Sequence, residues 1–434
     1  MKKRLFGILV LGLISILRLN AQNTYLHCSK IFNSETAKYE SGEFTIIVKD
    51  DKIVKISDGF DNPKGNNAIV YNLKDKVVYP GFIDMHVHIE NETNPNKYLE
   101  QYQDEEADVA FKSLKYAKRT LMAGFTTVRD VGGTGVNIAL RDAISRGEVV
   151  GPRVFTAGKA LATTGGHADP TNGSNERYIG NPGPKEGVVN GGDDAKKAVR
   201  QRYKNGADMI KITATGGVLS QAKNSSNPQF TVEEIKVITK TAADYGFHVA
   251  AHAHGDLGMQ RAILGGVKTI EHGTLMSDKT MQMMIDNDVY LVPTIIAGKY
   301  VTEKAQDKGY YPEVVRPKAL EIGPKIQDMF SRAYKKGVPI VFGTDAGVYP
   351  HGENWKEFGY MIEAGMPVNE AIQSATLTAA SILKKEKELG QIKKGFFADI
   401  IALEEMPIKN NTKAFQKVSF IMKNGNVYKS KDDF

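Results

Sequence analysis

The sequence predicts an α/β fold in which a (β/α)8 barrel carries a small β-sandwich domain built from both ends of the chain. Three observations lead to this prediction. Strand-like apolar runs alternate with helical patterns through the middle of the 434-residue chain, eight such runs can be counted there, and short strand patterns occur near both termini. The alternation favours parallel strands, and the count of eight favours a barrel.

The eight expected barrel strands are short apolar runs. They comprise residues 82–88, 126–130, 153–157, 209–213, 248–252, 269–272, 290–294 and 339–344. Helical patterns fit between several of them, such as residues 109–123 and 232–245, and the second begins with a capping box formed by Thr231 and Glu234. A doubly wound open sheet is the alternative, but it requires a glycine-rich phosphate loop after its first strand, which residues 84–88 do not form.

Both chain ends contain patterns of short alternating strands. Residues 44–48 and 53–56 flank an Asp50-Asp51 turn, and residues 399–403 and 418–421 precede a turn at 424–426. Neither half is long enough to fold alone. We therefore expect residues 22–80 and 389–434 to form one composite β-sandwich domain, and residues 81–388 to form the barrel.

The first 21 residues have the pattern of a signal peptide. A basic start at residues 2–4 precedes an apolar run from Leu5 to Leu17, and Ala21 supplies a small residue at the cleavage site. The run is shorter than the roughly 20 apolar residues that span a bilayer, which disfavours a membrane anchor. We expect export of the protein to the periplasm or the medium, with residues 1–21 removed and no stable membrane insertion afterwards.

The composition excludes several classes of protein. With 41% hydrophobic and 25% charged residues, the chain can bury a large core, which excludes a disordered, collagen-like or coiled-coil protein. Lysine and arginine exceed aspartate and glutamate by 57 to 50, but four of these cations lie in the first twenty residues. The charge therefore gives no argument for nucleic acid as a partner. The single cysteine, Cys28, cannot form an internal disulfide.

Three long segments follow expected strands three, four and seven. They are residues 158–192, 216–228 and 297–324, and the first two are rich in glycine, proline and asparagine. Loops of this length in a compact domain are usually functional or disordered. All three follow the C-terminal ends of strands, where barrel enzymes build their active sites.

Histidines cluster at these same strand ends. Of nine histidines, seven lie at or just beyond the end of an expected strand: His86, His88, His167, His252, His254, His272 and His351. Imidazole is the commonest metal ligand among side chains, and several converging from different strands satisfy a zinc site, although any single histidine is more often structural. His86 and His88 alternate on one strand, so both point into the barrel mouth.

Lys211 and Asp345 add two unusual charges. Lys211 lies on an expected buried strand, where an unpaired ammonium is costly. An ion pair with a neighbouring carboxylate is one explanation, and carbamylation of a neutral amine by CO₂, which creates a metal-bridging ligand, is the other. Asp345 follows the eighth strand and supplies a carboxylate to the same mouth, unless it only caps a helix.

These segments together resemble the amidohydrolase superfamily. Residues 80–88 are similar to its first-strand signature, and Lys211, His252, His272 and Asp345 match its remaining metal ligands in chain order. Residues 164–167, 229–231 and 252–255 most resemble the imidazolonepropionase-related branch, which includes Xaa-Pro dipeptidases and Xaa-Arg or Xaa-Lys carboxypeptidases. Mononuclear deaminases of the superfamily typically have histidine at the Lys211 position.

The resemblance implies a site with two divalent metal ions, for which we expect zinc. His86, His88 and Asp345 would hold the more buried ion, His252 and His272 the more exposed one, and carbamylated Lys211 would bridge them. The two ions would share one hydroxide and polarise the scissile carbonyl. Asp345 would take the proton of this hydroxide and pass it to the leaving amine.

The expected function is a secreted peptidase that cleaves dipeptides or short peptides at the C-terminal residue. The alternatives are a hydrolase of a cyclic amide, lactone or organophosphate with the same binuclear site, a zinc-dependent deaminase, and a non-catalytic binding protein. The expected partner is a small molecule or short peptide, and a monomer and a homo-oligomer are both open. We expect His167 and His254 to contact the substrate α-carboxylate, although His254 could instead orient His252.

Overall fold

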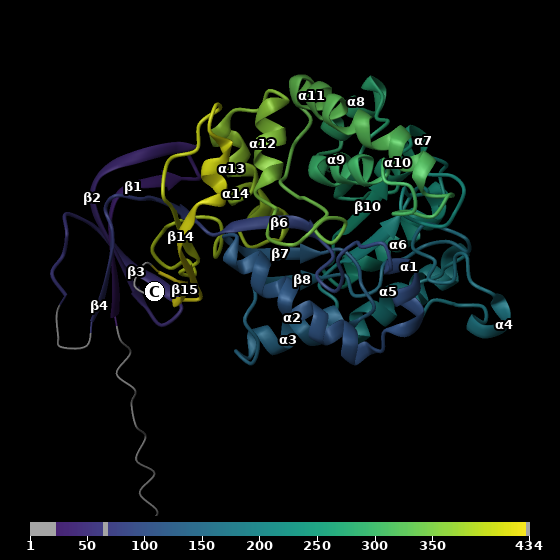
Figure 1. Ribbon diagram of the computed structural model, residues 1–434, viewed down its shortest axis with the longest axis horizontal. Coiled ribbons are helices and arrows are strands. Elements are labelled where there is room, and N and C mark those ends of the chain that lie inside the picture. The colour runs from purple at the N-terminus through teal and green to yellow at the C-terminus, as the bar shows by residue number, and fades with distance from the viewer. Residues whose placement is uncertain (1–22, 64–67, 431–434) are drawn as a thin grey trace, which may run out of the picture.

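The computed structural model describes residues 23–63 and 68–430 (Figure 1). Strands from both ends of the chain, purple and yellow in Figure 1, lie together at one end of the molecule, and the intervening residues form a larger body of strands and helices. The expected signal peptide, residues 1–21, lies outside the described residues. Across the described part of the chain, every helix is too short or too polar to cross a membrane.

One eight-stranded sheet joins the two chain ends. Its strands are β1 (Asn23–Asn33), β2 (Lys38–Lys49), β3 (Lys52–Asp58), β4 (Ile69–Leu73), β5 (Val77–Pro80), β13 (Ile400–Leu403), β14 (Val418–Lys423) and β15 (Asn426–Lys429). They run in the order β15-β14-β13-β5-β1-β2-β3, and β4 pairs with β1 beside β5. The expected hairpins are both present, as β2–β3 and β14–β15.

Burial of apolar side chains explains why the two ends combine. β5 pairs with β13 in antiparallel register, with Pro80 opposite Ile400. Leu26 and Ile46 from the N-terminal strands and Phe420 from β14 are fully buried in one cluster, together with Cys28, which has no disulfide. Each large apolar side chain contributes about 1.5–3 kcal/mol when it is fully buried. Neither end could bury its apolar face without the other.

Two parallel sheets form the centre of the larger body. One comprises β6 (Phe82–Val87), β7 (Phe125–Asp130) and β8 (Arg153–Thr156), and the other β9 (Ile210–Thr213), β10 (Val249–Ala253), β11 (Thr269–His272) and β12 (Tyr290–Val292). Almost every residue of these strands is buried, as expected for parallel strands covered on both faces. The expected α/β class is confirmed, and these seven strands match seven of the eight expected runs to within two residues.

Backbone hydrogen bonds connect the two parallel sheets at both of their edges. At one edge, the N–H of Asp208, which precedes β9, donates to the carbonyl of Thr156 on β8 over 2.7 Å. At the other, the eighth expected run, residues 339–344, is irregular instead of forming a strand, but it still bridges β12 to β6. Ile340 pairs with Leu291, and the N–H of Met85 donates to the carbonyl of Phe342 over 3.0 Å.

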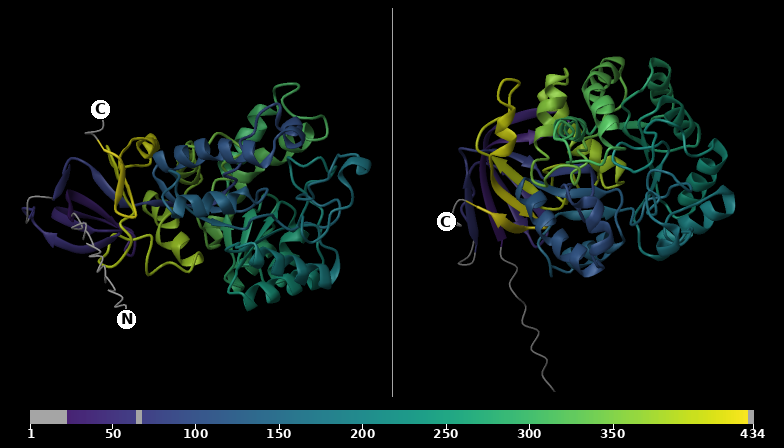
Figure 2. Two further views of the ribbon diagram at one scale, coloured as in Figure 1. Left: turned by 90° about the horizontal axis from the view of Figure 1, so that it is seen from below. Right: turned by 45° about the vertical axis from the view of Figure 1, so that its right-hand side comes forward.

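Helices follow the strands and lie around them (Figure 2). They are α1 (Lys97–Gln103), α2 (Glu106–Met122), α3 (Val136–Ser145), α4 (Glu176–Ile179), α5 (Gly191–Lys204), α6 (Val232–Asp244), α7 (Asp256–Leu264), α8 (Asp278–Asp286), α9 (Ile295–Lys304), α10 (Arg316–Ile322), α11 (Ile326–Lys336), α12 (Lys356–Glu363), α13 (Val368–Ser374) and α14 (Leu377–Ile382). The expected capping box of α6 is present: Glu234 N–H donates to Thr231 Oγ1, and Thr231 N–H donates to Glu234 Oε2.

The third long segment differs from expectation. Residues 297–324 are not a long loop, because most of α9 and all of α10 lie within them. The carboxylate of Glu357 on α12 accepts hydrogen bonds from the N–H groups of Ile295 and Ile296 at 2.9 and 2.8 Å, and so satisfies the first turn of α9. This cap is remote in sequence, so the usual local signals for a helix start are absent.

Candidate active site

A cavity of about 410 Å³ opens at the C-terminal ends of the parallel strands. Each of the three long segments contributes to its wall, as the sequence predicts. Their contributions include His167, Ala168, Val218, Leu219, Val301 and Ile322. The floor holds every expected metal ligand, and most of the remaining wall is apolar.

The expected ligands converge on the floor of this cavity. His86 Nε2 and His88 Nε2 each lie 3.4 Å from Asp345 Oδ1. The ligand atoms of His86, His272 and Asp345 lie within 4.8 Å of one another, as do those of His252, His254 and His272. His272 therefore lies between two groups of donors, which is the arrangement that a site for two neighbouring ions requires.

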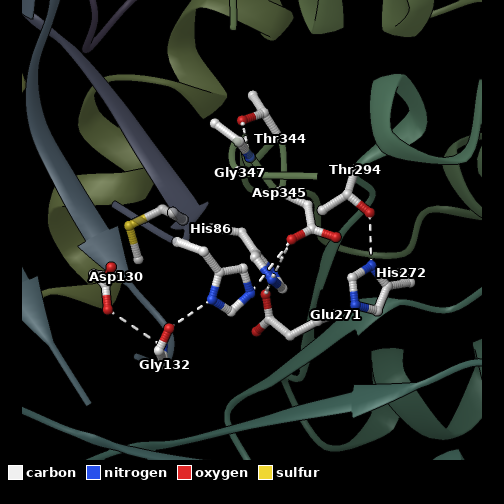
Figure 3. Close-up of polar contacts among 12 residues, drawn as sticks. His86, Asp130, Gly132, Glu271, His272, Thr294, Thr344, Asp345 and Gly347 are labelled. Atoms are coloured by element: carbon white, nitrogen blue, oxygen red, sulfur yellow. Dashed lines mark hydrogen bonds and ion pairs between the residues drawn. The ribbon is translucent and has the colours of Figure 1, made fainter. Parts of the chain in front are cut away.

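Each of these imidazoles is oriented by its second ring nitrogen. His86 Nδ1 donates to Glu271 Oε2 over 2.7 Å, and His88 Nδ1 donates to the carbonyl of Gly132 over 2.6 Å. The Nδ1 of His272 hydrogen-bonds to the Thr294 hydroxyl over 2.7 Å (Figure 3). In contrast, His252 uses Nε2, which donates to the carbonyl of Gly216 over 3.1 Å. In each ring the other nitrogen is left to face the cavity.

The cluster is electrostatically suited to a cation. Burial lowers the pKa of His88 and His254 to about 4 and that of His252 and His272 well below the usual value, so these rings are neutral at pH 7. Neutral imidazole is the form that binds metals. Burial opposes ionisation of Asp345, but the neighbouring His86, His88 and Lys211 outweigh it and lower its pKa.

Lys211 is buried on β9 and lines the same cavity. Among the described residues it forms no ion pair, which disfavours the first of the two explanations offered for its burial. Burial lowers the pKa of Lys211 to about 8, although the charges of Glu271 and Asp345 oppose this shift. A buried amine that loses its proton readily is the form that reacts with CO₂.

Strained backbone occurs at the end of β11, just after β12, and just after the irregular residues 339–344. His272, Thr294 and Asp345 have φ values of 72°, 50° and 62°, in the left-handed region that residues other than glycine rarely adopt. Such strain costs roughly 1–3 kcal/mol for each residue and persists only where surrounding contacts enforce it. Here it turns the His272 and Asp345 side chains toward the donor cluster (Figure 3).

A buried ion pair below the cluster was not predicted from the sequence. Arg129 on β7 and Glu271 on β11 are fully buried, and Arg129 Nη2 donates to Glu271 Oε1 over 2.8 Å. Burial disfavours the charge of Glu271, but Arg129 and His86 outweigh it and hold its pKa well below the usual range. Glu271 in turn orients His86. An arginine within a buried strand is a signal of the same kind as Lys211, and it could have been noticed.

Of the remaining predicted histidines, His167 and His254 line the cavity and His351 does not. The His167 ring lies 4.3 Å from that of His252 between centroids. His254 Nδ1 hydrogen-bonds to the Thr274 hydroxyl over 2.9 Å. His351 lies outside the cavity wall, where its Nε2 donates to the carbonyl of Asn91 over 3.0 Å. Its role is to hold the loop that follows β6.

This donor set fits divalent metal ions. The described residues bring together imidazoles, a carboxylate and a buried lysine, and one ring nitrogen of each histidine has a hydrogen-bond partner that leaves the other nitrogen available. Metal-bound histidines almost always have such partners. Nitrogen ligands combined with a carboxylate suit zinc and similar metals.

The fold and the site together define a hydrolase that acts on amide bonds. The chain belongs to the Amidohydrolase family, whose model matches residues 77–429. Members of this superfamily generally bind metal ions, in agreement with the donor cluster.

Individual proteins of similar sequence or structure indicate which branch of the family the chain resembles. It is 31% identical over 373 residues to ochratoxinase of Aspergillus niger, covering 81% of this chain and 76% of the relative. A structure of a Xaa-Pro dipeptidase with methionine bound in its active site matches with a TM-score of 0.90 and 47% identity, covering 94% of this chain and 100% of the other. A prolidase complexed with N-methylphosphonate-L-proline matches with a TM-score of 0.86 and 28% identity over the same shares. The expected resemblance to the superfamily and its prolidase-like branch is confirmed.

Proposed function

We propose that this protein is a metal-dependent peptidase that hydrolyses dipeptides or short peptides at the C-terminal residue. The observation that carries the proposal is the convergence of four histidines, Lys211 and Asp345 beneath a cavity with an apolar wall. Its similarity to a Xaa-Pro dipeptidase that holds methionine, and to a prolidase that holds a proline derivative, supports a substrate with an apolar C-terminal residue.

The proposed centre contains two divalent ions, most simply zinc. His86, His88 and Asp345 would hold one ion, and His252 and His272 the other, with Lys211 as a carbamate between them. The shared position of His272 between both donor groups and the unpaired state of Lys211 among the described residues support this assignment. The bonds that join the two parallel sheets at both edges support a closed (β/α)8 barrel as the scaffold.

The protein's own residues supply positioning and proton transfer. When bound, the two ions would polarise the amide carbonyl and lower the pKa of a water molecule. Asp345 Oδ1 faces His86 and His88 from 3.4 Å, and so lies where it can accept the proton of the attacking water and deliver it to the amide nitrogen. His167 and His254, neutral at pH 7, contact the substrate through hydrogen bonds.

A dipeptide library tests the proposal. Purified protein, analysed in parallel for bound metal, should release free amino acids from dipeptides with an apolar C-terminal residue, and a chelator should abolish this activity. Release of ammonia in place of an amino acid would indicate a deaminase. A metal-free protein without any hydrolytic activity would indicate a binding protein.

The second candidate is a hydrolase of a cyclic amide, a lactone or an organophosphate at the same centre. Similarity to ochratoxinase favours a substrate that is not a simple peptide. One fold and one metal centre support many substrates, so this candidate predicts the same metal content with no cleavage of dipeptides.

A further inference from the structure

The cavity contains a cation that the proposed metal centre does not use. Among the described residues of its wall, the lysines are Lys97 and Lys211, and the carboxylate is Asp345. We infer that the Lys97 ammonium binds the substrate α-carboxylate and so selects substrates with a free C-terminus. This inference rests on the proposed peptidase function and names the residue that recognises the end of the peptide.

The surroundings of Lys97 favour an anionic ligand. Lys97 begins α1, is half-buried and donates a hydrogen bond from Nζ to Asn91 Oδ1. Among the described residues no carboxylate forms an ion pair with it, unlike Lys112 on the neighbouring α2, which pairs with Asp104 over 2.6 Å. A partly desolvated ammonium that no carboxylate contacts directly is unfavourable. A carboxylate in the cavity would relieve this cost through charge-assisted hydrogen bonds.

The other basic groups nearby cannot supply this charge. Burial lowers the pKa of His167 to about 3 and that of His254 to about 4, so both are neutral hydrogen-bonding groups at pH 7. Burial lowers the pKa of Lys97 only to about 8, because the charges of Asp345 and Glu100 oppose the shift. At pH 7 Lys97 is therefore largely protonated.

Lys318 is also unsuitable, although it lies beneath the loop formed by residues 216–228. Its Nζ donates to the carbonyls of Gly217, Ser220 and Ala222 over 3.2, 2.6 and 2.7 Å. All three hydrogens of this ammonium have partners, so its structural role is to hold the loop.

Hydrogen bonds on both sides of Lys97 hold its segment against the cavity that the metal ligands and the apolar residues also line. The N–H of Asn91 donates to the carbonyl of His88, and the Asn91 carbonyl accepts from His351 Nε2. From the other side, the hydroxyl of Tyr98 donates to the carbonyl of Leu219 over 2.8 Å. In a dipeptide the α-carboxylate is attached to the carbon next to the scissile nitrogen. A cation in the wall of the cavity that also holds the metal ligands is compatible with that short separation.

The test compares binding of L-leucine and L-leucinamide to the metal-loaded protein by calorimetry, because binding requires no turnover. The wild type should prefer leucine. Lys97→Met and Lys97→Gln should both weaken leucine binding by roughly tenfold to a hundredfold, the scale of a hydrogen bond to a charged group, with unchanged metal content. The second variant retains a polar end that can contact Asn91, so it separates loss of charge from local misfolding. Lys97→Arg should retain most of the preference.

The matched control is Lys115→Met, which removes an exposed lysine from α2 and should leave the preference unchanged. Equal binding of leucine and its amide by the wild type would overturn the inference, as would a preference that survives in both Lys97→Met and Lys97→Gln. If leucine binding depends on Lys97 but the wild type cleaves no dipeptide, the peptidase proposal alone fails.

Discussion

The buried pair of Arg129 and Glu271 allows a quantitative test of how buried residues hold the proposed metal ligand His86 in place. Arg129→Met keeps most of the side-chain volume but removes the guanidinium that donates to Glu271, to the Thr269 hydroxyl and to the carbonyl of Met85. Both members of the pair have no exposed surface. Glu271 is then left as a buried carboxylate without its cation and has to bind a proton.

Breaking such a pair from one side costs about 3–5 kcal/mol, because the remaining charge is uncompensated. We expect Arg129→Met to lower the free energy of unfolding by this amount. The double variant Arg129→Met/Glu271→Gln should lose distinctly less, since it leaves no buried charge and its amide oxygen can still accept from His86 Nδ1. The metal affinity of Arg129→Met should also fall, because Glu271 would no longer orient His86.

Urea unfolding of the wild type and variants, followed by circular dichroism and by the fluorescence of the single tryptophan, Trp355, measures these differences. Arg146→Met serves as the control, because Arg146 pairs with Glu148 at the surface, where both side chains are more than half exposed. It should leave the unfolding midpoint unchanged. A loss below about 1 kcal/mol in Arg129→Met, or an equal loss in the double variant, would refute this account of the pair.

Three further predictions concern the site itself. Lys211→Ala should lose metal and activity together, with partial rescue by a short carboxylic acid, and retention of two tightly bound metals by this variant would contradict the carbamate. Asp345→Asn should keep the fold while lowering kcat at least about 10²-fold, as expected for a positioned general base, and an active variant with an unchanged pH profile would place the proton elsewhere. His254→Ala should raise KM for dipeptides and leave the metal content intact, and metal loss would instead make His254 a ligand.

The sequence predicts the strands well because a parallel strand covered on both faces must be apolar along its whole length. It does not predict that residues 339–344 are irregular. Their bridge to Leu291 involves the single residue Ile340, and the pattern of apolar side chains carries no information about this backbone detail. The start of α9 also cannot be predicted from the neighbouring sequence, because the residue that caps it, Glu357, lies on another helix.

The candidate site, too, could be predicted from the sequence only in part. The histidines, Lys211 and Asp345 stand out individually because each is an unusual residue at the end of, or within, an apolar strand. The contact between Arg129 and Glu271 is invisible until β7 and β11 are placed in space, since the two residues are 142 positions apart. Lys97 has no sequence signal at all: it is one of many lysines, and only its place in the cavity wall sets it apart.

The pairing of β5 with β13 has a consequence for the order in which the protein folds. A separation of 320 positions along the chain lies between Pro80 and its partner Ile400, so this ladder cannot form until the last strands have been synthesised. Until then the edge of β5 exposes unpaired backbone groups, which are a template for aggregation. Contacts of such long sequence separation also form slowly, because closing the loop costs entropy before any contact is gained. Refolding should therefore end in a slow docking of the C-terminal strands, and chains shortened before β13 should aggregate.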